Sequence, residues 1–218
     1  SCAARLRRND EHVPIVMLER GPHVSFANCG LPYFIGNVID EEAKLLVADV
    51  ALFRNRFNVD ALVNQRVVSI DPEAKQVEVE RGDSGERYRL TYQKLVMSPG
   101  AQPIRPPLPG IDLPGIFTLR NVPDSVHIKD WIEKHRPHRA VVVGAGFIGL
   151  EMVEQLHGLG MPPSLVELQD QVLPPLDREM ARLIEEELRK HDIPLYLGDG
   201  IAKIDVGADG AATGITLD

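Results

Sequence analysis

A glycine motif in the second half of the chain restricts the possible folds more than any other feature. Gly144, Gly146 and Gly149 follow a strand expected at 139–143 and precede the helical pattern 150–157. A strand, a glycine turn and a helix in this order are typical of a Rossmann nucleotide-binding unit. The first glycine makes the tight turn, the second lets the backbone approach a pyrophosphate, and the third allows close helix–strand packing. The motif therefore predicts an α/β fold.

An acidic residue follows this turn at the expected spacing. The short apolar strand 164–166 leads to Glu167, 23 positions after Gly144. A Rossmann unit has its acidic residue about 20 positions after the turn. A carboxylate there accepts hydrogen bonds from ribose hydroxyls and repels a 2′-phosphate. We therefore expect NADH to be favoured over NADPH, with its pyrophosphate at the helix N-terminus.

The first half of the chain contains a candidate redox cysteine. Cys29 stands between Asn28 and Gly30, and Pro32 predicts a helix that begins near Gly30. A thiol at a helix N-terminus lies beside unpaired N–H groups, which favour the thiolate that attacks disulfides. The alternative is a buried, inert cysteine. Two cysteines in 218 residues favour a reducing compartment, and therefore the cytoplasm.

The start of the chain has the order of the second half of another nucleotide-binding unit. Residues 1–8 form a helical pattern, residues 13–18 form an apolar strand, and Glu19 and Arg20 follow it. Glu19 is predicted to bind a ribose hydroxyl, and Arg20 beside it is a second candidate cofactor contact. Because no glycine turn precedes the helix, we expect roughly a dozen further residues upstream.

The remaining pattern predicts three capped helices and several strands. Asp49 is expected to cap one helix, either Asn121 or Asp124 the second, and Asp177 the third. Further strands are expected at 65–70, 77–80 and 95–98.

A proline-rich segment divides the chain. Residues 102–114 contain five prolines, and such a segment can form neither a helix nor an interior strand. We therefore place a domain boundary inside it, between residues 1–107 and 108–218.

Composition and charge exclude several classes of function. The net charge of −8 argues against broad binding of nucleic acid. No apolar run reaches the roughly 18 residues that a membrane span needs. His135 and His138 have no cysteine or paired acid beside them, so no metal site is predicted. A local basic group remains, formed by Arg5, Arg7 and Arg8.

Three segments together resemble the single-cysteine flavin-dependent disulfide reductases. The resemblance is to the branch of coenzyme A disulfide reductases, NADH-dependent persulfide reductases and NADH oxidases. The segments are Ser-Phe-Ala-Asn-Cys-Gly-Leu-Pro-Tyr at 25–33, Gly-Ala-Gly-Phe-Ile-Gly-Leu-Glu at 144–151 and Leu-Pro-Pro-Leu-Asp-Arg-Glu-Met at 173–180. Pro99, Gly100 and Ala101 resemble the end of the family's second flavin-binding strand.

The resemblance implies a fold and a chemistry. The fold would be two Rossmann-like three-layer nucleotide-binding domains, both incomplete: part of an FAD-binding domain at 1–107 and an NAD(P)H-binding domain at 108–218. Electrons would pass from NADH to FAD and then to Cys29. The cysteine would cycle between a thiolate and a mixed disulfide with coenzyme A, a persulfide or a sulfenic acid. A homodimer is implied, because the family's dimerisation domain completes the active site in the partner subunit.

The resemblance also gives roles to single residues. Ser25 and Asn28 would line the cysteine pocket, Phe147 would separate flavin from nicotinamide, and Glu151 would lie near the flavin. The basic group of Arg5, Arg7 and Arg8 would reach the phosphates of coenzyme A. The implied cofactor-binding residues are Glu19, Arg20, Pro99, Gly100, Ala101, Gly144, Gly146, Phe147, Ile148, Gly149, Glu151 and Glu167.

Three functions stay open on the sequence. The first is a reductase of coenzyme A disulfide or of a coenzyme A persulfide, and the second is an NADH oxidase. The third is a nucleotide-binding or redox-sensing module without turnover. The first flavin glycine loop and the dimerisation domain of the family are not among these 218 residues, so the piece alone is expected to be inactive.

Overall fold

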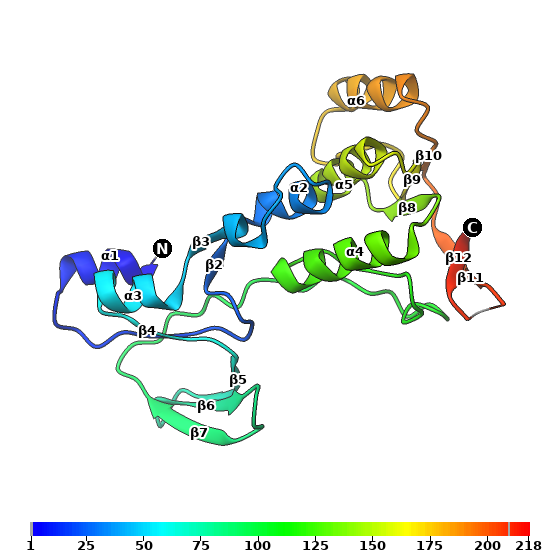
Figure 1. Cartoon of the computed structure of the whole chain (residues 1–218). Helices are drawn as coiled ribbons and strands as arrows, with labels where there is room; N and C mark the ends of the chain where they lie inside the picture. The colour runs from blue at the N-terminus through cyan, green and yellow to red at the C-terminus, as the bar shows by residue number, and fades with distance from the viewer. Residues whose placement is uncertain (1, 209) are drawn as a thin grey trace. The chain divides into compact units, whose positions relative to one another are not determined.

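The computed structural model describes residues 2–208 and 210–218, and it has a mixed α/β fold (Figure 1). Contacts divide the chain into two compact units. The first unit is Ser1–Ala27 with Leu46–Ala101, and the second is Asn28–Leu45 with Gln102–Asp218. The segment that contains Cys29 therefore groups with the second half of the chain. A domain boundary between 107 and 108 remains a prediction.

The first unit contains a small parallel sheet and two helices. Its elements are α1 (Cys2–Asn9), β1 (Val16–Leu18), α3 (Val50–Phe57) and β4 (Asp60–Leu62), with β1 and β4 paired in parallel. The core of this part contains Phe53, Val59 and Ala61. The Asp49 carboxylate caps α3 as predicted, because it accepts a hydrogen bond from the N–H of Leu52 at 2.7 Å.

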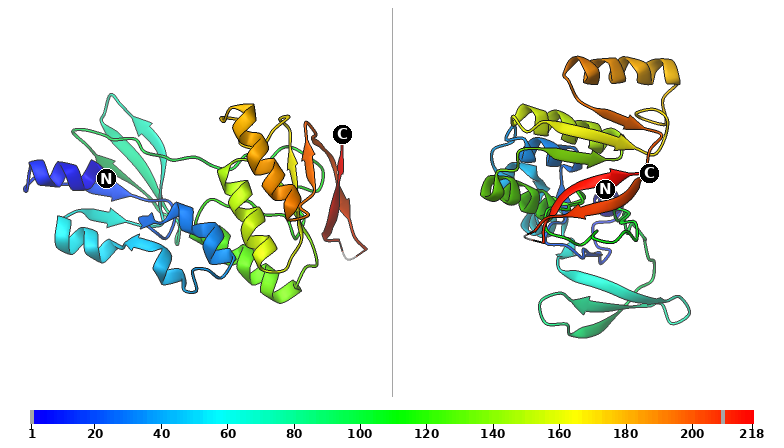
Figure 2. Two further views of the ribbon diagram at one scale, coloured as in Figure 1. Left: turned by 90° about the horizontal axis from the view of Figure 1, so that it is seen from above. Right: turned by 90° about the vertical axis from the view of Figure 1, so that its right-hand side faces the viewer.

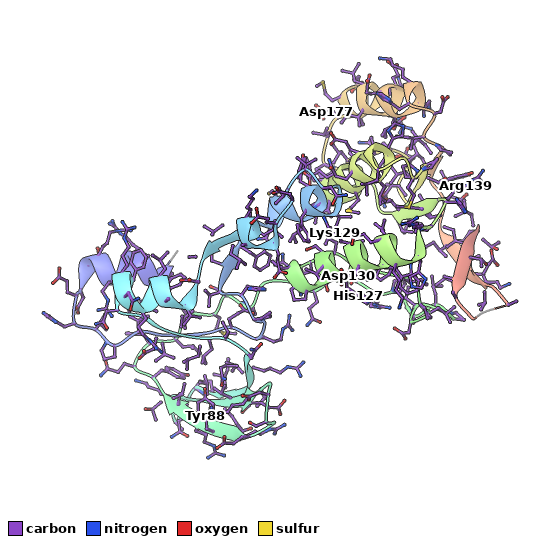
Figure 3. The ribbon with its side chains drawn as sticks, in the orientation of Figure 1. Tyr88, His127, Lys129, Asp130, Arg139 and Asp177 are labelled. Atoms are coloured by element: carbon purple, nitrogen blue, oxygen red, sulfur yellow. The ribbon has the colours of Figure 1, made fainter. Side chains whose placement is uncertain are left out.

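The first unit also contains antiparallel strands. One antiparallel sheet is the short pair β2 (Ser25–Phe26) and β3 (Leu46–Ala48). A separate sheet is the three-stranded meander of β5 (Gln65–Asp71), β6 (Gln76–Arg81) and β7 (Arg87–Thr91). Val77 and Val79 alternate as buried residues along β6, as the pattern predicted. Figure 3 labels Tyr88 on β7, where its hydroxyl donates to the side chain of Gln65 at 2.9 Å.

The strand expected at 95–98 is wrong in this structure. These residues form no strand, and Leu95, Val96 and Met97 are exposed. A strand exists only where a neighbour takes its backbone hydrogen bonds, and no described strand pairs with this segment.

The second unit is built on a parallel sheet with the strand order β10–β9–β8. Its alternating elements are β8 (Ala140–Val143), α5 (Phe147–Gly158), β9 (Pro163–Glu167), α6 (Arg178–Lys190) and β10 (Leu195–Leu197) (Figure 2). The core formed by α5, α6 and the sheet includes Val153, Leu165 and Ala181, all fully buried. This arrangement is the predicted Rossmann unit.

Helix α4 (Val122–His135) and the cysteine-bearing segment pack beside α5. That segment contains the 3-10 turns η1 (Asn28–Gly30) and η2 (Glu42–Leu45) and the short helix α2 (Leu31–Ile35). Ile35, Ile128, Met152 and Leu156 form one core between α2, α4 and α5. The hairpin of β11 (Ile201–Val206) and β12 (Ala212–Leu217) follows β10.

Candidate functional site

The glycine turn has the geometry that a dinucleotide needs. Gly144 has a φ of +100°, which favours glycine, and its N–H donates to the carbonyl oxygen of Val166 at 2.8 Å. A Cβ at Gly149 would collide with the carbonyl oxygen of Gly144, so only glycine allows this helix to approach the turn. A Cβ at Gly146 would meet nothing within 4 Å. The turn therefore leaves open space at its middle glycine, where a phosphate would approach the backbone.

The carboxylate of Glu167 is fixed against this turn. One oxygen accepts from the N–H of Ala145 at 2.7 Å, and the other accepts from the N–H of Gln169 at 2.9 Å. A carboxylate has about four lone-pair positions, so each oxygen can still accept from a hydroxyl. Glu167 is the last residue of β9, and Pro163 is its first, a place where proline is tolerated.

Helix α5 begins at the glycine turn without a side-chain cap. Gly146 is its N-cap residue and offers no side chain to the first N–H groups. Phe147 and Ile148, in the first turn, are exposed, with Phe147 at 67%. The uncapped N–H groups, the open glycine and the fixed Glu167 together fit the pyrophosphate and ribose of a dinucleotide.

Cys29 is exposed and lies in the turn η1 directly before α2. Pro32 lies in the first turn of α2, and Gly30 is its N-cap, so the helix begins where the sequence predicted. Leu31, Phe34 and Ile35 are buried and anchor the helix. The alternative of a buried cysteine is contradicted, because Cys29 is exposed whereas these neighbours are buried.

Two residues near Cys29 had not been predicted. Arg120 donates from Nη1 to Oδ1 of Asn28 at 3.3 Å. The phenol of Tyr33 has a raised pKa, chiefly because of the negative charge of Glu151, and then because of desolvation, Glu154 and Cys29. Glu151 was predicted by resemblance, and the structure brings it together with Tyr33. No sequence signal identifies Arg120, because it lies 92 positions from Asn28.

In the first unit the candidate cofactor residues are spread along the chain. Oε1 of Glu19 accepts from the N–H of Gly21 at 2.7 Å, so this carboxylate closes the turn after β1. Arg20 is exposed, and Ser25 is half-buried in β2. Pro99, Gly100 and Ala101 are exposed and irregular, and Gly100 has a φ of +69°.

The basic group on α1 contains one structural residue. Arg7 is only 8% exposed, and its guanidinium donates to the carbonyl oxygens of Phe57, Asp10, Val13 and Asn58 at 2.7 to 3.0 Å. These bonds use four of the five N–H donors of this buried guanidinium, so the structure gives Arg7 a structural role in place of the expected phosphate contact. Arg5 and Arg8 are exposed and remain candidates.

The described ranges, 2–208 and 210–218, show neither a metal-ligand cluster nor a membrane-spanning helix. They contain no cluster of three or more His, Cys, Asp or Glu side chains that could hold a metal ion. Within the same ranges, no helix has the length and apolar character to cross a membrane.

Comparison with known proteins decides the family. The model of the pyridine nucleotide-disulphide oxidoreductase family matches residues 1–217. The chain belongs to this family. Its fold, a parallel nucleotide-binding sheet with a glycine turn before α5, is therefore that of the FAD- and NAD(P)-binding oxidoreductases.

Similar proteins show which branch of the family the chain is near. It is 34% identical over 204 residues to the coenzyme A disulfide reductase of Staphylococcus haemolyticus (strain JCSC1435), covering 94% of this chain and 46% of the relative. A reduced Bacillus anthracis CoADR-RHD structure has 44% identity and a TM-score of 0.91, covering 98% of this chain and 40% of that one. An NAD-dependent persulfide reductase from A. fulgidus has 35% identity and a TM-score of 0.92, covering 99% of this chain and 40% of that one. The chain thus spans about half the length of the curated relatives it matches.

Proposed function

We propose that this chain is part of an NAD(P)H- and FAD-dependent oxidoreductase that reduces coenzyme A disulfide, or a coenzyme A persulfide, at Cys29. The observation that carries the proposal is the exposed Cys29, which groups in one compact unit with the glycine turn and Glu167. The names of the similar proteins, a coenzyme A disulfide reductase and a persulfide reductase, support the substrate class. Part of the FAD-binding domain would be 1–107, and the NAD(P)H-binding domain would be 108–218.

In the proposed reaction the chain binds NADH and presents a thiolate. Gly144, Gly146 and Gly149 form the pyrophosphate cradle, and Glu167 holds the ribose. FAD, when bound, would supply the two-electron relay between nicotinamide and sulfur. The Cys29 thiolate attacks one sulfur of the substrate disulfide, whose S–S bond breaks as a mixed disulfide forms and the other sulfur leaves as a thiolate. Two electrons and one proton then restore the Cys29 thiolate and release the second thiol.

Further parts of the proposal concern assembly, location and cofactor. The protein would be a cytoplasmic homodimer that favours NADH, and Ser25, Asn28, Phe147 and Glu151 would line the path from nicotinamide to sulfur. Arg5 and Arg8 would contact the phosphates of coenzyme A.

Replacement of Cys29 by serine in the full-length protein tests the function. Cys29→Ser should reduce NADH consumption with coenzyme A disulfide to background, because an alcohol cannot form the mixed disulfide. The control is Cys2→Ser, since Cys2 is also exposed and should be dispensable.

Unchanged turnover in Cys29→Ser would contradict the proposal. Faster turnover with oxygen than with coenzyme A disulfide or persulfide would replace it with an NADH oxidase. Absence of turnover with every acceptor would replace it with a binding or sensing module.

A further inference from the structure

Arg120, directly before the N-cap of α4, and Lys129 on α4 bond to the cysteine-bearing segment on both sides of Cys29. Before the cysteine, Arg120 donates to the side-chain oxygen of Asn28 at 3.3 Å. After it, the ammonium of Lys129 donates to the carbonyl oxygen of Phe34 at 3.2 Å and to the side chain of Asn37. Figure 3 labels Lys129 on the side of α4 that faces α2. These bonds join residues more than 90 positions apart, so the segment around Cys29 is tied to Arg120 and Lys129.

The backbone at Arg120 is itself fixed. Oδ2 of Asp124 accepts from the N–H of Arg120 at 2.9 Å and from the N–H of Asn121 at 3.1 Å. The side chain of Asn121 in turn accepts from the N–H of Asp124 at 2.9 Å. This reciprocal capping box and the bond from the Arg120 N–H to Asp124 fix the backbone of the half-buried Arg120 directly before the N-cap of α4. The Arg120 guanidinium therefore donates to Asn28 from a backbone whose position is fixed.

Acidic side chains act on the short helix that follows Cys29. Tyr33 on α2 has a raised pKa because Glu151, Glu154 and Cys29 act on it along with desolvation, which places these four groups in one electrostatic environment. Two carboxylates disfavour a thiolate beside them. On α4, the Asp124 carboxylate is bound to N–H groups, and the Lys129 ammonium is bound to Phe34 and Asn37. Arg120 carries a positive charge and is bonded to Asn28, the residue next to Cys29.

We propose that Arg120 is a positioning residue for Cys29, which fixes Asn28 through its hydrogen bond and supplies the positive charge that keeps the thiol reactive. This inference rests on the proposed role of Cys29. Arg120 acts through Asn28 and the local field, and it need not touch the substrate.

The test measures the reactivity of Cys29 and requires no turnover. The full-length protein and its variants are alkylated with iodoacetamide between about pH 5 and 10, and the rates at Cys29 and Cys2 are read separately by mass spectrometry. Arg120→Met should slow Cys29 about fivefold at neutral pH and shift the midpoint of its pH profile upward, because a nearby charge is removed. The rate at the exposed Cys2 should not change.

Further variants separate charge, hydrogen bond and fold. Arg120→Lys should retain part of the rate, because it keeps the charge and loses the planar fork. Arg120→Gln can still donate to Asn28 and carries no charge, so it should shift the pH profile as Arg120→Met does. The control is Arg139→Met, an exposed arginine directly before β8 (Figure 3), which should behave as the unaltered protein does.

A double-mutant cycle with Asn28→Ala completes the test. If Arg120 positions Asn28, the effects of Arg120→Met and Asn28→Ala on the alkylation rate should not add. Wild-type rates and pH profiles in both Arg120→Met and Arg120→Gln would overturn the proposal, as would full additivity. Because alkylation is read without NADH, these outcomes remain distinct from a failure of the proposed function, which Cys29→Ser detects through turnover.

Discussion

The charge of Glu167 is expected to set the preference for NADH over NADPH. Its two oxygens accept from the N–H groups of Ala145 and Gln169, and in the proposed function its negative charge would face the ribose of the nucleotide. Glu167→Gln keeps the size, removes the charge and replaces one accepting oxygen with an NH2 group, which cannot accept a hydrogen bond. The preference for NADH over NADPH, measured as a ratio of dissociation constants, should fall about tenfold as repulsion of the 2′-phosphate disappears.

The control for Glu167→Gln is Glu186→Gln, an exposed residue of α6 that should leave the ratio unchanged. An unchanged ratio in Glu167→Gln would show that this carboxylate does not face the 2′-position.

Tyr33 offers a titration that reports on the cysteine's surroundings. Its pKa is raised mainly by Glu151, so the neutral phenol persists to higher pH than in an ordinary tyrosine. Glu151→Gln should therefore move this titration to lower pH. Ultraviolet absorbance of tyrosinate measures it, and Tyr33→Phe identifies the step that belongs to this residue. If Glu151→Gln leaves the step in place, the two groups are not coupled.

At the scale of the element, helices α4 and α6 show how much an N-cap side chain contributes to the free energy of unfolding. The side chain of Asn121 accepts at the N-terminus of α4, whereas the N-cap Asp177 of α6, labelled in Figure 3, makes no such bond. Asn121→Ala should lower the free energy of unfolding by about 1 kcal/mol. Asp177→Ala, as the matched control, should lower it by less. Urea unfolding midpoints of the full-length protein compare the two, and equal losses would contradict the assignment.

The elements that the sequence predicted are those with local causes. Apolar periodicity, Pro32 and the caps Asp49 and Asn121 act over a few residues, and so does the strand–turn–helix around Gly144. The expected strand at 95–98 was wrong because strand formation depends on a neighbour that the local pattern does not reveal.

The residues of the candidate site also fall into two groups, those that local motifs predict and those that only the fold brings together. The glycine turn, Glu167 and Cys29 could be found from motifs, because each chemical task needs particular residue types at a short spacing. The bond from Arg120 to Asn28 joins residues 92 positions apart. The fourfold use of the Arg7 guanidinium depends on how α1 meets residues 57 and 58. Folding brings these groups together, and one sequence carries no sign of either contact.

At the scale of the whole molecule, the chain leaves one compact unit and returns to it. Residues 28–45 pack with 102–218, whereas 1–27 and 46–101 form the other unit. The family match extends over both units. The residues of the proposed reaction are therefore distributed between two bodies that the same chain connects three times.

This threading means that no single cut separates the units intact. A polypeptide of 102–218 would keep the glycine turn and Glu167 but would lack Cys29, and the core face of α4 and α5 around Ile128, Met152 and Leu156 would lose Ile35. A polypeptide of 1–101 would keep the thiol without the helices that support it. A contiguous deletion therefore separates Cys29 from the helices that pack against its segment. Point substitutions are needed to remove one function while both units stay folded.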